Sequence, residues 1–352
     1  MSDLAVSYTQ LNDGASLLER QHGHLERMAG YLETQGRLAT PAPGRILQVL
    51  QPLGDEIADA GAQALRAAGR LAQWGSEGAS ATLHDYVDAD RRAYEALRAL
   101  SIRFGDDALS PFPDLDDTDE ATATAGPGET VDPASHLIAP QPAGDPVKEL
   151  CRRAQLLLGD VDHIAETLLG YRILDEYVAG PLGGDWGSVD AASQAWAYEA
   201  DAVMEVAANV SMLSSQLDGW KGEGADAFGR AMTAISGGAV ALGYAFEQVS
   251  SRVAAVQHVA ARASAGITLA LQRVSERLRR MLVESSIPTG GATAAGEAAD
   301  ALQKVFFYLR TVNTLIGAIL DAVDDLADAR QKLMRAVMAL EDLVVAANRA
   351  VQ

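Results

Sequence analysis

Hydrophobic residues recur at steps of three and four along most of this chain, which is the period of one face of an α-helix. One such stripe runs from residue 189 to 217 and contains a single polar residue, Glu199. A second stripe of the same period runs from residue 225 to 267. Because a strand would alternate every second residue, the pattern predicts two antiparallel helices that reverse between the stripes.

The reversal falls on Trp220-Lys221-Gly222. Gly219, Gly222 and Gly224 tolerate backbone angles that other residues resist, and the Trp220 ring is large enough to cover the end of a helical bundle. Trp220 is also the only one of the four tryptophans that is followed by glycine two positions later. We therefore predict a hairpin corner at this point, for which an ordinary structural corner is the simplest alternative.

The first 104 residues have the same helical period and predict a second hairpin. Its helices are expected at about residues 3–35 and 46–104. The bend is expected at Thr40-Pro41-Ala42-Pro43-Gly44, since proline lacks a backbone donor and disfavours helix in the residue before it. Trp74-Gly75 lies inside the second helix and predicts a kink at most.

After residue 146 the pattern predicts helices at about residues 147–178 and 225–284, a loop at 285–296, and a last helix at about 297–348. The last helix has the most regular heptads: Val305, Leu309, Val312, Ile316, Ile319, Val323, Leu326, Arg330, Leu333, Val337, Leu340 and Val344. Arg330 is the only polar residue in this stripe, where it either fixes the helix register or extends its charged end to solvent. We expect the last helix to fold back along the preceding one. The N-terminal hairpin would then cover the half of this pair left exposed by the shorter helices and complete a second four-helix bundle.

Residues 106–146 differ in composition, with ten acidic residues, no Lys or Arg, and seven prolines. Such a segment cannot bury a core and predicts a disordered linker. The expected organisation is a helical hairpin at 1–104, a linker at 105–146, a helical domain at 147–284, and a long C-terminal helix at 285–352 that packs on this domain. The fold class is all-α, with elongated helical hairpins, four-helix bundles and long heptad-patterned helices.

Tyr86 and Asp90 are four residues apart near the end of a predicted helix, so their side chains share one helix face. The same spacing recurs at Tyr171 and Asp175. We prefer the first pair by position, because it lies shortly before the acidic linker. A solvated helix face is the simplest alternative for both pairs.

These residues resemble the motifs of a known secretion family. The segment from Gly183-Gly184-Asp185-Trp186 through Trp196 to Trp220-Lys221-Gly222 is similar to the WxG-type domain of actinobacterial type VII (ESX) secretion substrates, as found at the head of large secreted toxins. The resemblance covers about residues 146–284. Tyr86 and Asp90 match the family's Y-x-x-x-[DE] export motif. The N-terminal hairpin resembles the EspC-like small type VII targets, although it lacks W-x-G at its turn.

The resemblance implies a PE-PPE/ESX-like substrate, scaffold or partner protein that acts by helix–helix interaction and has no catalytic residues. It implies recognition by a type VII secretion ATPase or chaperone, with self-association or a WxG-family partner as further interactions. The protein would be cytoplasmic before export and then secreted or placed on the cell surface. Two alternatives stay open: a targeting or partner module of a polymorphic toxin system, and a structural homo-oligomer resembling secreted PE-PPE-like factors.

Charge and hydropathy disfavour other partners. The formal net charge of −20 argues against nucleic acid or an anionic membrane, because both require clustered Lys and Arg. The N-terminus lacks the apolar segment of a cleaved signal peptide. The most apolar run, residues 305–320, is interrupted by Arg310 and Asn313, so we expect no membrane span.

Chemical motifs are also missing from the sequence. His22 and His24 are two residues apart and point differently on a helix, so neither metal nor cofactor is expected. No glycine loop ending in Gly-Lys-Ser/Thr and no G-x-S-x-G turn is present, which predicts that the protein is not an enzyme. Phe306-Phe307-Tyr308, together with Arg330, forms a candidate partner surface, with core packing as the alternative for the aromatic residues.

Overall fold

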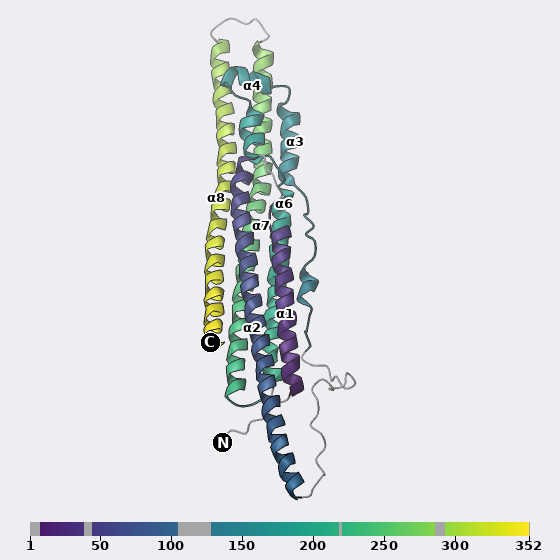
Figure 1. The fold of residues 1–352 in the computed structure, drawn as a ribbon. Coiled ribbons are helices and arrows are strands. Elements are labelled where there is room, and N and C mark those ends of the chain that lie inside the picture. The colour runs from purple at the N-terminus through teal and green to yellow at the C-terminus, as the bar shows by residue number, and fades with distance from the viewer. Residues whose placement is uncertain (1–7, 39–43, 105–127, 218–219, 286–292, 352) are drawn as a thin grey trace.

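The computed structural model describes residues 8–38, 44–104, 128–217, 220–285 and 293–351. Its α-helices are α1 (Tyr8–Gln35), α2 (Arg45–Phe104), α3 (Pro146–Leu158), α4 (Asp162–Leu169), α5 (Gly180–Leu182), α6 (Gly187–Gln216), α7 (Glu223–Ser285) and α8 (Thr293–Val351). A 3-10 turn, η3 (Pro133–His136), and a π-helical turn, η4 (Asp175–Ala179), complete the described elements. These residues contain no strand, which confirms the all-α, elongated fold class (Figure 1). The predicted bends at 40–43 and 286–292, the linker residues 105–127, and Gly219 lie outside the described residues.

Two long antiparallel helices form the axis of the rod. α7 has 63 residues, a length of about 95 Å at the usual rise per residue, and α8 runs back along it with 59 residues. The bounds of α2, α6, α7 and α8 agree within a few residues with those predicted from the hydrophobic period, and α2 is continuous across Trp74-Gly75 as expected. Below, the corner end is the end of the rod where α6 ends and α7 begins, and the distal end is the opposite end, where α7 ends and α8 begins (Figure 1).

The N-terminal hairpin packs beside α6 on the corner half of the rod, whereas we expected it on the other half. α1 and α6 are joined where Trp196 Nε1 on α6 donates to the carbonyl of Gly36, at 3.3 Å. The distal half of α7 is covered instead by α3, where Ser275 Oγ donates to the carbonyl of Leu157 at 2.6 Å. α3 and α6 therefore lie end to end along α7 and not side by side, which leaves the space beside α6 for the hairpin (Figure 1).

The single helix predicted over residues 147–178 is wrong, because the chain turns twice within it. α3 ends just before Gly159, and α4 ends just before Gly170, whose φ of 82° lies in the left-handed region that glycine adopts most readily. Between the helices, the buried carboxylate of Asp162 accepts hydrogen bonds from the backbone N–H groups of Ile173 and Leu174, at 2.8 and 3.2 Å. These bonds hold the second turn closed, so the segment folds into a compact cap over the distal half.

The prediction of a disordered linker is also wrong for residues 128–145, which we call the strap. The strap lies along α1 and α6, and Pro133 at its 3-10 turn is buried. Asp132 begins this turn by accepting from the N–H of Ala134, at 2.9 Å. At the other end Asp145 accepts from the N–H groups of both Lys148 and Trp186, at 2.7 and 3.1 Å, and so caps α3 while holding the start of α6.

Candidate functional site

The corner predicted at Trp220 is present, with α6 ending just before it and α7 beginning just after it. The Trp220 side chain is only 7% exposed, and its ring centre lies 5.4 Å from that of Phe228 on the first turns of α7. The backbone N–H of Trp220 donates to the carbonyl of Leu217 at 2.9 Å, which continues the end of α6 into the turn. The indole therefore covers the end of the α6–α7 pair.

Gly222 completes the corner. Its φ of 116° lies in the left-handed region, where any other residue would be strained. The carbonyl of Gly222 accepts from the N–H of Asp226 at 3.1 Å and so begins α7. A side chain at Gly224 would also meet the indole, since its Cβ would lie 3.3 Å from Cζ2 of Trp220. Glycine at these two positions allows the start of α7 to press against the ring.

Tyr86 and Asp90 come from α2, yet the structure brings Tyr86 to this corner. A small hydrophobic cluster, separate from the main core, contains Leu11, Ala15, Ala79, Leu83, Val87, Leu217 and Trp220, with Tyr8, Tyr86, Ala225 and Phe228 packed against it. Its members come from α1, α2, the end of α6 and the start of α7. The hydroxyl of Tyr86 lies 3.6 Å from the position that a Cβ on Gly224 would take. We call this cluster, together with Asp90, the corner site.

Asp90 lies one turn beyond Tyr86 and is exposed. Its carboxylate accepts a hydrogen bond from the hydroxyl of Tyr8, which begins α1. Burial, and then this hydrogen bond, raise the pKa of Tyr8 to about 12, so the phenol remains a donor at physiological pH. The sequence does not predict this contact, because a hydroxyl near the start of a helix gives no indication of an acceptor 82 residues away.

Past the corner, α2 continues as a projecting helix, which Figure 1 shows extending beyond the other helices at this end of the rod. Ala89, Asp90 and Ala93 are exposed along it. Tyr86 is half-buried and lies where the packed part of α2 gives way to the projecting part. The corner site thus presents one face of α2 beside the covered end of the α6–α7 hairpin.

Two buried polar atoms at the corner have no hydrogen-bond partner among the described residues: Nε1 of Trp220 and Oε1 of Gln216. A buried donor or acceptor left unpaired costs about 1–3 kcal/mol. Such groups are uncommon in native proteins and occur at strained or functional positions. The contacts within the corner therefore leave two buried polar atoms without a hydrogen bond among the described residues.

The second Tyr and Asp pair differs from the first in geometry. Tyr171 lies in the turn after α4, before the next helical residues, whereas Asp175 begins the π-helical turn η4. The Tyr171 ring faces Tyr177, with ring centres 6.0 Å apart. The pair is not presented on one continuous α-helix, unlike Tyr86 and Asp90.

The candidate partner surface lies far from the corner. Phe306 and Phe307 are 52% and 65% exposed near the distal end, so the alternative of core packing is wrong for both rings. Tyr308 is partly buried against the core and meets Phe307 edge-on, with ring centres 5.6 Å apart. Arg330 extends out of the α8 stripe and pairs with Glu56 of α2 at 2.8 Å, which ties α8 to the N-terminal hairpin. A partner for these residues stays a prediction.

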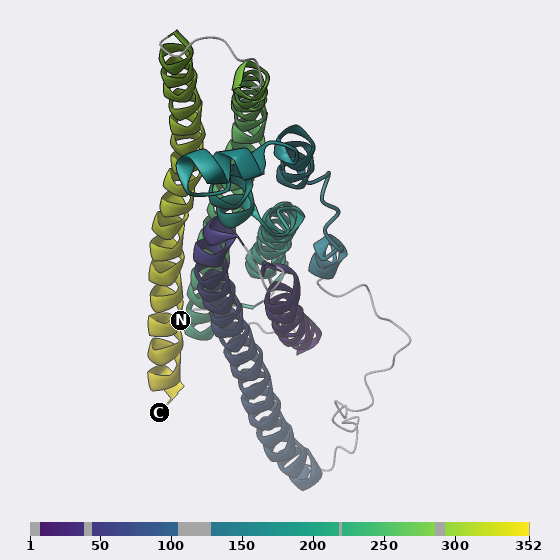
Figure 2. The ribbon, with the colours of Figure 1, turned by 90° about the horizontal axis from the view of Figure 1, so that it is seen from above.

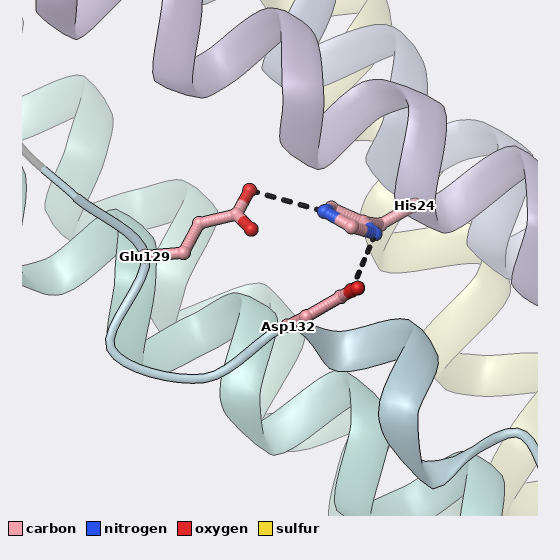
Figure 3. A group of neighbouring side chains, drawn as sticks. All are labelled: His24, Glu129 and Asp132. Atoms are coloured by element: carbon pink, nitrogen blue, oxygen red, sulfur yellow. Dashed lines mark hydrogen bonds and ion pairs between the residues drawn. The ribbon is translucent and has the colours of Figure 1, made fainter.

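One group of side chains has the composition of a metal site: His24, Glu129 and Asp132, whose ligand atoms lie within 4.8 Å of one another. Figure 3 shows the imidazole of His24 between the two carboxylates, with Nε2 3.0 Å from Glu129 and Nδ1 3.4 Å from Asp132. The two carboxylates thus face opposite edges of one ring, where a single ion cannot bond to both nitrogens. Arg27 also lies 2.6 Å from Nδ1, which places a positive charge at the same point. The geometry favours an ionic contact between α1 and the strap over a metal centre.

Comparison with protein-family models, curated proteins and solved structures gave no match to this chain.

By length and composition, α8 could cross a membrane, since its residues Ala299–Ala347 include an apolar window of mean hydropathy 1.3 that is 28% buried. Soluble core helices pass the same test, and α8 packs on α7 and α2 at the edge of the bundle (Figure 2). The expectation that the chain has no membrane span remains a prediction.

Proposed function

We propose that this protein is a substrate or partner protein of a type VII secretion system and acts through helix–helix contacts. The secretion ATPase or its chaperone binds the corner site. Tyr86 and Asp90 form the export motif, and Trp220 and Gly222 form the adjoining turn. Export takes the protein from the cytoplasm to the cell surface or the medium, and no catalytic step is involved.

The observation that carries this proposal is that two motifs from distant parts of the sequence meet in one cluster. Each motif alone is weak, because a short pattern occurs often by chance. The contact between the two motifs is a property of the fold. It does not depend on how often either short pattern occurs by chance in a sequence. Asp90 is exposed and Tyr86 is half-buried, so a partner reaches the motif without unfolding the rod.

The chain provides a matched control for testing the motif. In a host that has a type VII system, the Tyr86→Ala variant should reach the medium at a level at least about tenfold below wild type, the effect of losing about 1.4 kcal/mol of binding energy. Tyr171→Ala removes the same side chain from the same spacing, but outside a continuous α-helix, and should leave export unchanged. Immunoblots of cell and culture fractions measure both. Equal export of wild type and Tyr86→Ala, at equal cellular levels, would refute the role of the motif.

Self-association is the second candidate function, and the outer face of α8 favours it. Leu320, Met334, Met338 and Val345 are all more than a third exposed on this helix, and their spacing of 14, 4 and 7 residues places them on one face. An exposed apolar stripe of this kind typically marks a contact surface. A scaffold of several copies would cover it.

Light scattering tests this candidate. A homo-oligomer would have a mass that is a multiple of 37.0 kDa, and Met338→Glu, which places a charge in the middle of the exposed stripe, would return it to the monomer. Tyr244→Glu is the control, because Tyr244 is similarly exposed but belongs to α7. A monomer at every concentration would exclude self-association through α8.

A further inference from the structure

Besides the buried Pro133 and the packing of Leu137 against the core, the strap is held to the bundle by polar contacts to side chains of α1 and α6. Asn209 on α6 accepts from the N–H of Thr130 at 3.1 Å and lies 3.4 Å from the carbonyl of Val131. Gln194, further along α6, accepts from the N–H of Gln141 at 2.9 Å and donates to its carbonyl at 3.1 Å. These contacts fix the strap at two separate levels of α6.

α1 holds the same segment from the other side. Gln21 Nε2 donates to Glu129 at 2.8 Å, and the hydroxyl of Tyr31 donates to the carbonyl of Ile138 at 2.7 Å. Gln21 also lies 3.4 Å from Asn209, so α1, α6 and the strap meet in one buried polar contact. The strap therefore bridges the seam between the N-terminal hairpin and the rest of the rod.

Glu199 lies on α6 between these two levels and is the only polar residue of its stripe. It is fully buried, and neither carboxyl oxygen has a hydrogen-bond partner among the described residues. Burial raises the pKa of Glu199 well above its ordinary value of 4.5, because the closed bundle favours the neutral form of this carboxyl over the charged form.

The titratable group that faces Glu199 from α1 is Tyr31, the residue that holds Ile138 of the strap. Burial raises the pKa of Tyr31, and Glu199 raises it further when its carboxyl is ionised, which is the effect expected of two acidic groups placed close together. Tyr198, the neighbour of Glu199 on α6, acts on Tyr31 in the same direction. No hydrogen bond from α2, α7 or the strap reaches the Glu199 carboxyl among the described residues.

We propose that the strap and Glu199 form a proton-dependent clasp that holds the N-terminal hairpin against α6. With Glu199 protonated, α1 closes over a neutral carboxyl, and Tyr31 of α1 holds the strap at the carbonyl of Ile138. When Glu199 ionises, a carboxylate that is buried and has no partner is strongly unfavourable. The clasp then opens so that water can solvate the charge. The clasp is independent of the proposed export function, although opening would also move Tyr8 and Leu11 of α1 away from the corner site.

The direction of the pH effect follows from proton linkage. Closure takes up a proton, because the pKa of Glu199 is higher in the closed form than in water. The clasp is therefore fully formed below about pH 4.5, the ordinary value, and weakens as the pH rises through the raised value. A neutral side chain of the same shape would remove this dependence.

Amide hydrogen exchange on the full-length protein tests the clasp. The reporters are the N–H groups of Thr130, Gln141 and Ala143, which donate to Asn209, Gln194 and Asp190 at 3.1, 2.9 and 2.9 Å. After correction for the intrinsic effect of pH on exchange, their protection in wild type should fall as the pH rises from about 5 to 8, by up to about tenfold per pH unit for one linked proton.

In Glu199→Gln the protection of the three amides should be independent of pH over the same range. Asp201→Asn is the control, because it removes an exposed carboxylate from the same helix and should keep the wild-type slope. Circular dichroism verifies that each variant is folded, and Glu199→Leu, which is also neutral, replaces the glutamine variant if that variant is unfolded. Amide protection that does not change with pH in wild type would overturn the proposal. The same pH dependence in the neutral variants as in wild type would also overturn it.

Discussion

Trp196→Ala is expected to lower the free energy of unfolding by about 3–5 kcal/mol, the usual cost of truncating a fully buried tryptophan. The side chain is 1% exposed and lies against α7, α2 and the residue that follows α1. It meets Phe246 of α7 edge-on, with ring centres 5.1 Å apart, and donates to the carbonyl of Gly36 at the end of α1. On α2, a Cβ at Gly61 would lie 2.6 Å from the ring, so the backbone approaches the indole closely there.

Removing this ring leaves a cavity at the point where the N-terminal hairpin meets α6 and α7. Urea unfolding followed by far-UV circular dichroism measures the change without depending on tryptophan fluorescence. Trp74→Ala is the matched control, because Trp74 is only partly buried on the surface of α2 and should cost less than half as much. A loss below about 1.5 kcal/mol for Trp196→Ala would mean that the hairpin is not docked as the structure places it.

The long helices could be predicted from the sequence because their stability depends on one repeating face. α6, α7 and α8 each bury a stripe of period three and four, and Val189, Val249 and Val312 of these stripes are fully buried. The exception within the α6 stripe was equally informative, since Glu199 is buried with the rest of the face. A polar residue in such a stripe points to a special role even before its surroundings are known.

The breaks and the strap could not be predicted in this way, because tertiary contacts decide them. The turn after α4 is held by Asp162, whose buried acceptor serves amides more than ten residues later. The strap has the acidic, proline-containing composition of a disordered segment, yet Asn209, Gln194 and Asp190 of α6 satisfy its backbone. Composition measures how much apolar surface a segment can bury, and it does not reveal polar partners elsewhere in the chain.

The predicted docking position of the N-terminal hairpin was wrong for a related reason. The expectation assumed that the helix before α6 would lie alongside it, as the number and length of apolar stripes suggested. Asp145 instead holds the N-terminus of α3 and the backbone of Trp186 at one point, so the two helices run in opposite directions from it. One capping carboxylate thus decides which half of α7 is left for α1 and α2.

Trp220→Ala is the second change with a large expected effect, and it acts on the corner site. The substitution removes the largest apolar side chain from the cluster that joins α1, α2, α6 and α7. Tyr86 and Phe228 lose their packing partner, so amide exchange at the end of α6 and along residues 79–87 of α2 should accelerate. If the corner site is the export surface, the variant should not be detected in the culture medium.

Trp220→Phe separates packing from recognition at the same position. Phenylalanine keeps an aromatic ring against Phe228 and removes the buried indole N–H, which has no acceptor among the described residues. Removing an unpaired buried donor is favourable and offsets the unfavourable loss of buried apolar area. The free energy of unfolding should therefore change by less than about 1 kcal/mol. We expect export at the wild-type level, because the indole N–H contributes nothing to the packing of the corner.

Trp196→Ala serves as the control for stability in this experiment. It also removes a buried tryptophan that packs against the N-terminal hairpin, but its ring lies in the main core and not in the corner cluster. If export followed global stability, Trp196→Ala and Trp220→Ala would fail together. We expect Trp196→Ala to be exported at temperatures at which it is folded, while Trp220→Ala is retained, because only the second change removes the surface formed by Tyr86 and the turn. Equal retention of both would show that the secretion machinery reads the folded rod as a whole.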